Sequence, residues 1–175
     1  EEQIAFTTGL LIGIGDSFKE QVDGIHEIKE IHEEYGHIQE VIIQNFRPKL
    51  NTPLNSLPSP KEEYMLRLVS IARIILGPNM NLQVPPNITV GDFGDFINAG
   101  INDWGGVSPI TIDHVNPEAP WPQLKKLKSV TEKYGYQLKP RLPIYGEFLD
   151  RMETFVSQAM NDKLRNRSII GIKHK

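Results

Sequence analysis

The sequence contains no cysteine among its 175 residues. The chain therefore cannot form a disulfide, a thiolate metal site or a cysteine nucleophile from its own residues. Basic residues are not in excess either, since the formal net charge is −3. The sequence thus lacks the basic footprint of nucleic-acid-binding proteins, and we expect no nucleic-acid partner.

Long apolar runs are also missing. No run approaches the roughly 20 residues that a membrane-spanning helix needs, so we expect no membrane association. The first residues, Glu1-Glu2-Gln3, carry no basic group before the apolar stretch that follows, unlike a signal peptide. We therefore expect a cytoplasmic location. The sequence begins very close to its first predicted strand, which suggests that it was cut from something longer.

Hydrophobic residues make up 39% and charged residues 23% of the sequence, a mixture typical of a globular domain. Short apolar runs alternate with helical patterns along it. We predict strands at residues 7–15, 38–46, 81–85 and 101–107. We predict helices at residues 17–35, 61–76, about 89–99, 122–134 and about 146–164, followed by a basic tail at residues 165–175 that frays.

Local signals mark the ends of the first two predicted helices. Ser17 and Glu20 have the spacing of a capping box, and Gly36 supplies the stop of the same helix. Ser59 is the expected N-cap of the second helix, with a first-turn proline after it and Glu62 as its capping-box partner.

Alternation of strands and helices predicts a parallel α/β sheet with right-handed connections. No strand–Gly-x-Gly-x-x-Gly–helix unit is present, so a dinucleotide-binding sheet lacks its signature. The loops of unusual composition all follow strands, which places them on one rim, as in (β/α)8 barrels. The chain is too short for eight units, and we predict half of such a barrel at residues 1–145.

The four strand ends carry a family resemblance. GLLIGIGDS at residues 9–17, IQEVIIQNFRPK at 38–49, MNLQVPPNI at 80–88 and GINDWGGVSPITIDHVNPEAPWP at 100–122 resemble the radical S-adenosylmethionine subunit of FO synthase. The last motif is specific, and the first is shared with related radical enzymes. Asp16 stands where the shared pattern has Glu.

The resemblance implies that this chain forms strands five to eight of a radical-S-adenosylmethionine-type (β/α)8 barrel. Such enzymes use S-adenosylmethionine and a [4Fe-4S] cluster held by a Cys-x-x-x-Cys-x-x-Cys loop after the first strand. The cluster ligands are missing here, so we expect no metal ligand in this chain and an inactive chain in isolation. The implied partners are an N-terminal half-barrel, within the intact protein or supplied separately, and a second FO synthase subunit.

For the S-adenosylmethionine pocket, the resemblance implies contacts from Gly13, Gly15 and Asp16. Glycine lets a ligand approach strand backbone closely because it has no Cβ. The structural alternative is close packing of helix on strand, with Asp16 serving only to cap the helix.

For the substrate, the strand ends provide amides and an aromatic ring. Amide groups pair with a polar ring through a donor and an acceptor. Asn102 and Trp104 are predicted to share one face of the fourth strand, where they would suit a uracil-like ring. Structural alternatives are an amide that holds a loop, a core tryptophan and an aspartate that caps a turn. The predicted substrate-binding residues are Gln44, Asn45, Gln83, Asn102, Asp103, Trp104, Gly105 and Gly106.

Asp113 and His114 are a candidate acid–base pair, since histidine is suited to proton transfer near neutral pH. A brace within the loop is the structural alternative. By resemblance, the intact enzyme takes a hydrogen atom from a tyrosine–5-amino-6-ribitylaminouracil adduct and closes the deazaflavin ring of coenzyme F420 with loss of ammonia, as a lyase. The alternatives are a menaquinone-pathway radical cyclase and a non-catalytic half-barrel that acts as a structural or assembly partner.

Overall fold

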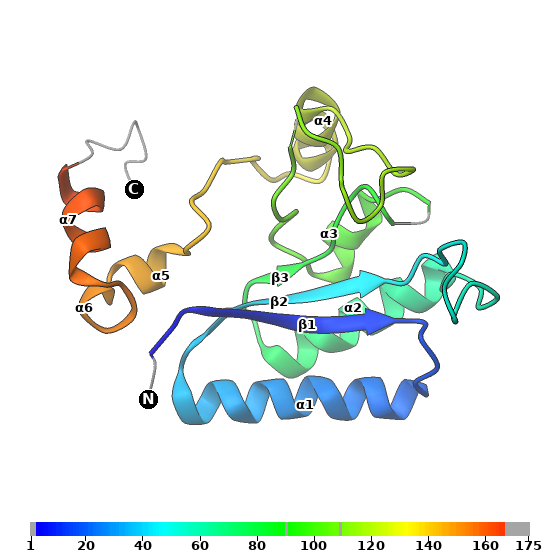
Figure 1. The fold of residues 1–175 in the computed structure, drawn as a ribbon, viewed down its shortest axis with the longest axis horizontal. Helices are drawn as coiled ribbons and strands as arrows, with labels where there is room; N and C mark the ends of the chain where they lie inside the picture. Colours follow the sequence, from blue (N-terminus) through cyan, green and yellow to red (C-terminus); the bar gives the residue numbers. More distant parts are fainter. Residues whose placement is uncertain (1–2, 90, 109, 167–175) are drawn as a thin grey trace.

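A parallel sheet with strand order β1-β2-β3 forms the centre of the computed structural model (Figure 1), which describes residues 3–89, 91–108 and 110–166. β1 spans Phe6–Ile12, β2 spans Ile38–Asn45 and β3 spans Leu82–Gln83. In the register, Gly9 of β1 is the partner of Ile42, and Ile42 is the partner of Gln83. These short apolar strands are parallel, as the strand–helix alternation predicts.

Two long helices cover one face of this sheet. α1 (Phe18–Tyr35) begins with the predicted capping box, in which Ser17 and Glu20 bond to each other's backbone and side chain. It ends at Gly36 in the left-handed conformation, so both predicted ends are confirmed. α2 (Glu62–Leu76) begins instead at Lys61, which makes no side-chain cap bond. The predicted Ser59 cap is therefore wrong.

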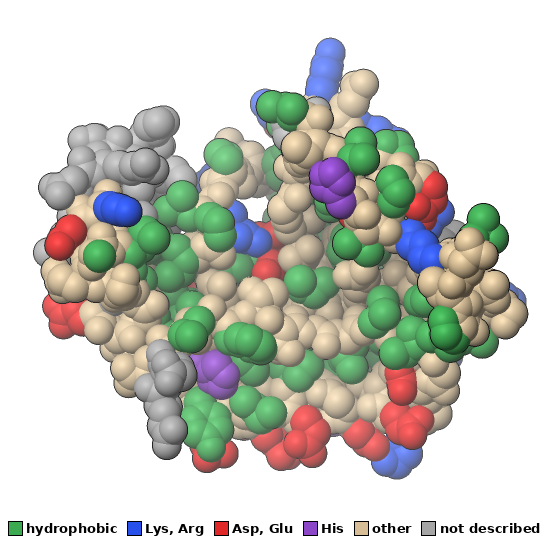
Figure 2. All heavy atoms as spheres, viewed as in Figure 1, with side chains coloured by type: hydrophobic (Ala, Val, Ile, Leu, Met, Phe, Trp, Pro, Cys, Tyr) green, Lys and Arg blue, Asp and Glu red, His purple; other side chains and the backbone are tan. Residues whose placement is uncertain are grey.

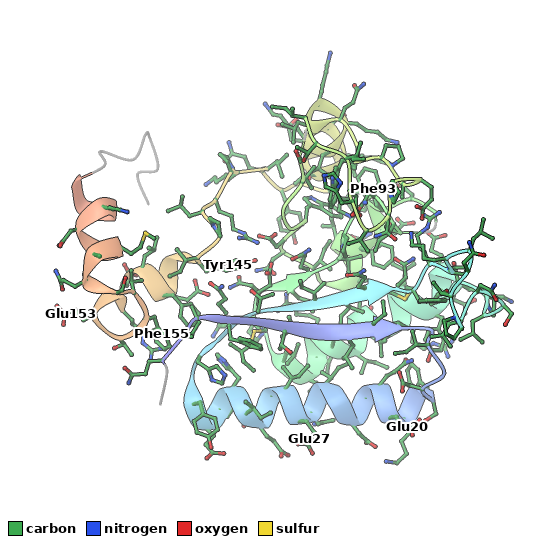
Figure 3. The ribbon with its side chains drawn as sticks, in the orientation of Figure 1. Glu20, Glu27, Phe93, Tyr145, Glu153 and Phe155 are labelled. Atoms are coloured by element: carbon green, nitrogen blue, oxygen red, sulfur yellow. The ribbon has the colours of Figure 1, made fainter. Side chains whose placement is uncertain are left out.

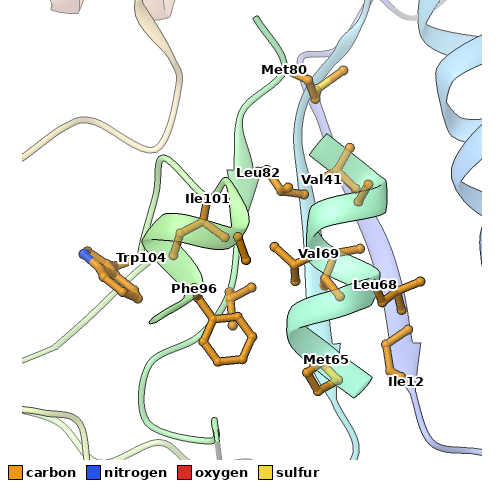
Figure 4. Close-up of a cluster of buried hydrophobic side chains, with 14 of the residues drawn as sticks. Ile12, Val41, Met65, Leu68, Val69, Met80, Leu82, Phe96, Ile101 and Trp104 are labelled. Carbon is orange, nitrogen blue, oxygen red and sulfur yellow. The ribbon is translucent and has the colours of Figure 1, made fainter. Parts of the chain in front are cut away.

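The hydrophobic core lies between the sheet and α2 (Figure 4). Val41 and Ile43 of β2 are fully buried, as are Leu68 and Val69 of α2. Alternate residues of a strand point to opposite faces, so the odd-numbered residues of β2 supply this face. The outer side of α1 is acidic, and Glu20 and Glu27 point away from the sheet (Figures 2 and 3).

The other face of the sheet, which we call the concave face, carries the even-numbered residues of β2. Residues paired in register point to the same side, so Gly9, Ile42 and Gln83 share this face. Asp103 joins them through an isolated parallel bridge to Gln83. A hollow of about 340 Å³ runs along β1 and includes Ile42 and Gln44 in its lining.

The predicted fourth strand at residues 101–107 is wrong, because only the bridge at Asp103 forms. One backbone bond, from the N–H of Asn102 to the carbonyl of Leu82 at 3.1 Å, joins this segment to β3, and side-chain bonds hold the rest. The Asn102 side-chain oxygen accepts the N–H of Leu82 at 2.7 Å, and the Asp103 carboxylate accepts the N–H of Gly105 at 2.6 Å. The second bond turns the chain at Gly105, which has φ 77°, a conformation that favours glycine.

Two other predicted elements are shorter than expected. β3 holds two residues where five were predicted, because Pro85 and Pro86 have no N–H to continue the ladder. The predicted helix at about residues 89–99 is α3 (Asp95–Ala99). Gly91 has φ 87°, which is incompatible with a helix beginning before it.

The predicted helix at residues 146–164 is divided into α5 (Gly146–Leu149), α6 (Met152–Phe155) and α7 (Gln158–Asn166). Ser157 begins the last of them, since its hydroxyl oxygen accepts the N–H of Met160. The predicted frayed tail begins inside α7, and residues 167–175 lie outside the described residues.

α4 (Leu124–Lys133) follows the loop at residues 102–123 and matches its prediction closely. An extended segment then runs from α4 back to α5 (Figure 1). We call residues 136–145 the crossing segment. Tyr145, at its end, lies between the C-terminal helices and the sheet (Figure 3). The protein is thus an α/β structure with a small parallel sheet.

Candidate functional site

The loops that follow the strands contact one another at one edge of the sheet. Lys49, after β2, donates to Glu118 of the 102–123 loop at 2.6 Å. Asn87, after β3, donates to the carboxylate of Asp113 at 2.9 Å and to the carbonyl of Ala119 at 3.1 Å. These contacts join the loops after β2 and β3 to the loop at residues 102–123, which carries the predicted site residue Asp113.

Gln44 and Asn45 end β2 on opposite faces. Gln44 lines the hollow on the concave face. Asn45 is 1% exposed and donates to the carbonyl of Ile88 at 2.7 Å, while its side-chain oxygen has no partner within the described residues. Asn45 therefore ties the loop after β3 to the sheet, whereas Gln44 faces the space where a ligand would lie.

Gln83 is the only predicted amide with both burial and a place on the concave face. It is 7% exposed, and no hydrogen bond to its amide is found in the described part of the chain. A Cβ at Gly105 would collide with that amide. Glycine at this position therefore gives the Gln83 side chain its room. Gly106 has open space around it.

Asn102 and Trp104 share one side of their segment, as predicted, but that side is the helix layer. Trp104 is 7% exposed, packs edge-on against Phe93 at 5.5 Å between ring centroids, and donates its indole N–H to Thr131 of α4 at 3.1 Å. Trp104 therefore matches the core-tryptophan alternative, and a contact between its ring and a substrate stays a prediction. Asn102 accepts from Leu82 and donates to Asn81 at 3.0 Å, which makes it a brace between segments.

Asp103 lies on the concave face and belongs to a charged network. Arg141 of the crossing segment donates through Nε and Nη2 to both carboxylate oxygens of Asp103, and through Nη2 to Glu40 at 2.9 Å. Tyr145 donates its hydroxyl to the same oxygen of Glu40 at 2.7 Å. The Arg141 guanidinium also lies 4.1 Å from the centroid of the Tyr145 ring.

Burial controls the ionisation of this network. It raises the pKa of Glu40, against the opposing effect of the bonds from Tyr145 and Arg141. It also raises the pKa of Tyr145, and the bond to Glu40 acts in the same direction. Sequence reasoning predicted Asp103 but missed Glu40, Arg141 and Tyr145. The signal was Glu40 itself, a charge within an apolar strand, because a buried carboxylate needs a partner.

Asp113 and His114 do not form a pair in the described structure. The Asp113 carboxylate accepts from the backbone of Val115 and Asn116 and from the side chains of Asn87 and Asn116. Desolvation is the largest single effect and raises the pKa of Asp113, but the four hydrogen bonds together outweigh it and lower the pKa from 3.8 to about 2. His114 is exposed. The geometry favours the brace over acid–base work.

The turn after β1 presents backbone without side chains. Gly13 and Gly15 have φ 104° and 122°, values that favour glycine. A Cβ at Gly13 would press on Pro60, whereas Gly15 has open space around it. Asp16 is exposed, and its backbone oxygen accepts from Gln21 at 3.4 Å. The open backbone at Gly15 fits a ligand better than the packed backbone at Gly13.

Curated relatives match most of this chain. It is 51% identical over 86% of its length to 7,8-didemethyl-8-hydroxy-5-deazariboflavin synthase of Methanopyrus kandleri and 48% identical over 93% to the same-named protein of Methanocaldococcus jannaschii. It is 51% identical over 79% to FO synthase of Mycobacterium tuberculosis. Over most of its length the chain is a homologue of part of these synthases. No protein-family model matches it.

The chain spans less than half the length of these synthases: 45% and 44% of the two archaeal proteins, and 16% of the mycobacterial one. Among the described residues, no helix has the length and apolar character to cross a membrane. The cytoplasmic location stays a prediction.

The cluster that the synthase family implies does not fit the residues of this chain. Iron–sulfur clusters are held by cysteine thiolates, and the sequence has no cysteine. The described residues also contain no group of three or more His, Asp or Glu side chains able to hold a metal ion. S-adenosylmethionine is different, because the open glycine backbone after β1 suits a ligand.

Proposed function

We propose that this chain is the substrate-binding part of FO synthase, the enzyme that forms the deazaflavin chromophore of coenzyme F420. The observation that carries the proposal is the row of Gln44, Gln83 and Asp103 on the concave face, below loops that contact one another. The similarity to synthases of that name supports it. The relatives do not favour the menaquinone-pathway alternative.

The proposed substrate is the tyrosine–5-amino-6-ribitylaminouracil adduct, and the reaction is its ring closure with loss of ammonia, by a radical S-adenosylmethionine lyase. Gln44 and Gln83 would bind the uracil ring, since a primary amide offers both a donor and an acceptor. Gly105 and Gly106 shape the same end of the site. Asn45 and Asn102 support the loops around it.

Gly13, Gly15 and Asp16 would form one edge of the S-adenosylmethionine pocket, in which the cofactor supplies the radical chemistry. Positive φ at both glycines turns the chain sharply at the end of β1, where backbone groups face outward. His114 stays a proposed proton carrier because its ring is exposed to the loop surface. Asp113 would position the loop that bears it.

We propose that the sheet is strands five to eight of the barrel, with the bridge at Asp103 marking the eighth. β1 lies at the end of the strand order, so one of its edges is open to a further strand. Exposed apolar residues, including Phe6 at 52% and Leu11 at 41%, lie along it. An N-terminal half-barrel with the cysteine loop would pair there. Without it, the chain is inactive.

Reconstitution tests this proposal. The chain is mixed with a segment that carries the cysteine loop, and the cluster is assembled anaerobically. Deazaflavin fluorescence is followed after S-adenosylmethionine, a one-electron reductant and the tyrosine–5-amino-6-ribitylaminouracil adduct are added. We expect product from the mixture and none from either part alone. Gln83→Leu should lower the yield about tenfold or more, because a buried amide contact to the substrate is lost.

Arg67→Met on the outer side of α2 is the matched control, since Arg67 is exposed and its ion pair in the described residues is with the exposed Glu63. It should leave the yield unchanged. A stable complex that contains the cluster and binds S-adenosylmethionine but forms no deazaflavin would overturn the enzyme proposal. That result would favour the structural-partner alternative, as would a defined self-assembled dimer in size-exclusion chromatography.

A further inference from the structure

Two side chains, those of Arg141 and Tyr145, hold the crossing segment on the concave face, and Arg141 makes its ion pairs. Arg141 bonds to Glu40 of β2 and to Asp103 beyond β3, and so links two segments of the concave face. Its guanidinium also lies over the Tyr145 ring at 4.1 Å. Residues 136–145 contain no helix or strand, so these contacts fix the segment where its own backbone does not.

Both carboxylates are largely withdrawn from water. The Glu40 side chain is 7% exposed and that of Asp103 is 14% exposed, against 29% for Arg141. A carboxylate in such a place costs free energy unless a cation pairs with it. Only a planar guanidinium has donors in a fixed fork that reach both oxygens of Asp103 and also Glu40. Lysine has the charge but not this geometry.

Asp103 connects Arg141 to the turn at Gly105, which belongs to the predicted substrate site. The oxygen that accepts from Arg141 at 3.0 Å also accepts the N–H of Gly105 at 2.6 Å. That bond turns the chain so that Gly105 lies directly against the amide of Gln83. Gln83 has no hydrogen-bond partner in the described residues, so its orientation depends on what packs around it.

We propose that Arg141 is a positioning residue for the substrate site: through Asp103 it fixes the Gly105 turn and thereby the direction of the free Gln83 amide. The crossing segment becomes the floor of the site. Asp103, predicted to touch the substrate, acts instead through this turn. The effect of Arg141 on substrate binding rests on the proposed function. The fixing of the Gly105 turn by Arg141 does not depend on that function.

The first test uses the chain by itself and hydrogen exchange of single amides. Arg141→Met should speed exchange at Gly105 and Tyr145 about tenfold or more, because a fixed turn and a fixed segment become free to open. Exchange at Ile43, in the helix-covered core, should not change. Arg141→Lys should behave like Arg141→Met. Full protection of Gly105 in either variant would overturn the proposal.

The second test separates positioning from general stabilisation in the reconstituted enzyme. Arg141→Met should raise KM for the tyrosine–5-amino-6-ribitylaminouracil adduct about tenfold, because a misdirected amide weakens substrate binding. Combined with Gln83→Leu, it should add almost nothing further, since both changes remove the same contact. Arg67→Met is the control for loss of a surface arginine. Effects of the two variants that multiply independently would contradict the coupling.

The two tests fail separately. If reconstitution gives no deazaflavin, the proposed function fails, while the exchange result still decides whether Arg141 fixes the Gly105 turn. If deazaflavin forms but Arg141→Lys has the wild-type KM and wild-type exchange, the function stands and the positioning role is overturned, because charge alone then suffices.

Discussion

The two faces of one small sheet differ in how their residues are satisfied. On the helix-covered face, Val41 and Ile43 are fully buried among apolar neighbours. On the concave face, Glu40 relies on an arginine about a hundred residues away in the sequence, and Gln83 has no partner in the described residues. The first face is complete within this chain. The second face leaves a buried amide, that of Gln83, without a hydrogen-bond partner among the described residues.

Neighbouring isoleucines of β2 test this contrast most strongly. Ile43→Ala should lower the free energy of unfolding by about 2–5 kcal/mol, since it empties a buried position of the core. Ile42→Ala, one residue earlier on the concave face, should lower it by less than half as much because Ile42 is only partly buried. Urea unfolding followed by circular dichroism measures both. Equal losses would mean that the concave face is also covered.

Trp104 tests which face holds the aromatic ring. Trp104→Phe should lower the free energy of unfolding by about 1–2 kcal/mol, because the indole bond to Thr131 and some packing are lost. Thr131→Val removes the same bond from the other side. The double variant should therefore be less destabilised than the sum of the single variants. If Trp104→Phe keeps full stability but loses substrate binding, the result would indicate that the Trp104 ring lies on the concave face.

The smallest expected effect is the pH response of the loop at Asp113. Its pKa is lowered to about 2 in the folded protein, so its bonds stabilise the loop fully above about pH 4. This stabilisation is lost as the pH falls through about 2. Amide exchange at Val115 and Asn116 should accelerate over that interval, while Asp113→Asn should show no such step. Exchange at these two amides that stays as fast relative to Asp113→Asn at pH 2 as at pH 5 would contradict the prediction.

Local signals were sufficient to predict part of the fold. The capping box at Ser17 and the stop at Gly36 depend on residues within a few positions, so the sequence shows them directly. The concave face depends on partners far along the chain: Arg141 is 101 residues from Glu40. No pattern at Glu40 identifies its partner, although its charge within an apolar strand indicates that one exists.

The predicted fourth strand failed for a related reason. Its apolar start suggests a strand. However, the Asn102 side chain accepts the N–H of Leu82, which a regular ladder would use, and the Asp103 side chain accepts the N–H of Gly105 and so turns the chain. Asparagine and aspartate compete in this way with regular structure. Strand alternation correctly predicted that Asn102 and Trp104 lie on the same side of the segment. It could not predict that this side is the helix layer, because side-chain bonds and not a ladder orient the segment.

Gly9 has a consequence for how the sheet accepts a neighbour. A Cβ at this position would collide with the carbonyl of Ile42, so a single methyl group would act as a wedge between β1 and β2. Such a group would push β1 away from β2 and displace the free edge of β1. A strand from a partner could then no longer pair with β1 in its present position. The absence of a side chain at Gly9 thus allows β1 to pair with β2 and keeps the free edge of β1 in place for a further strand.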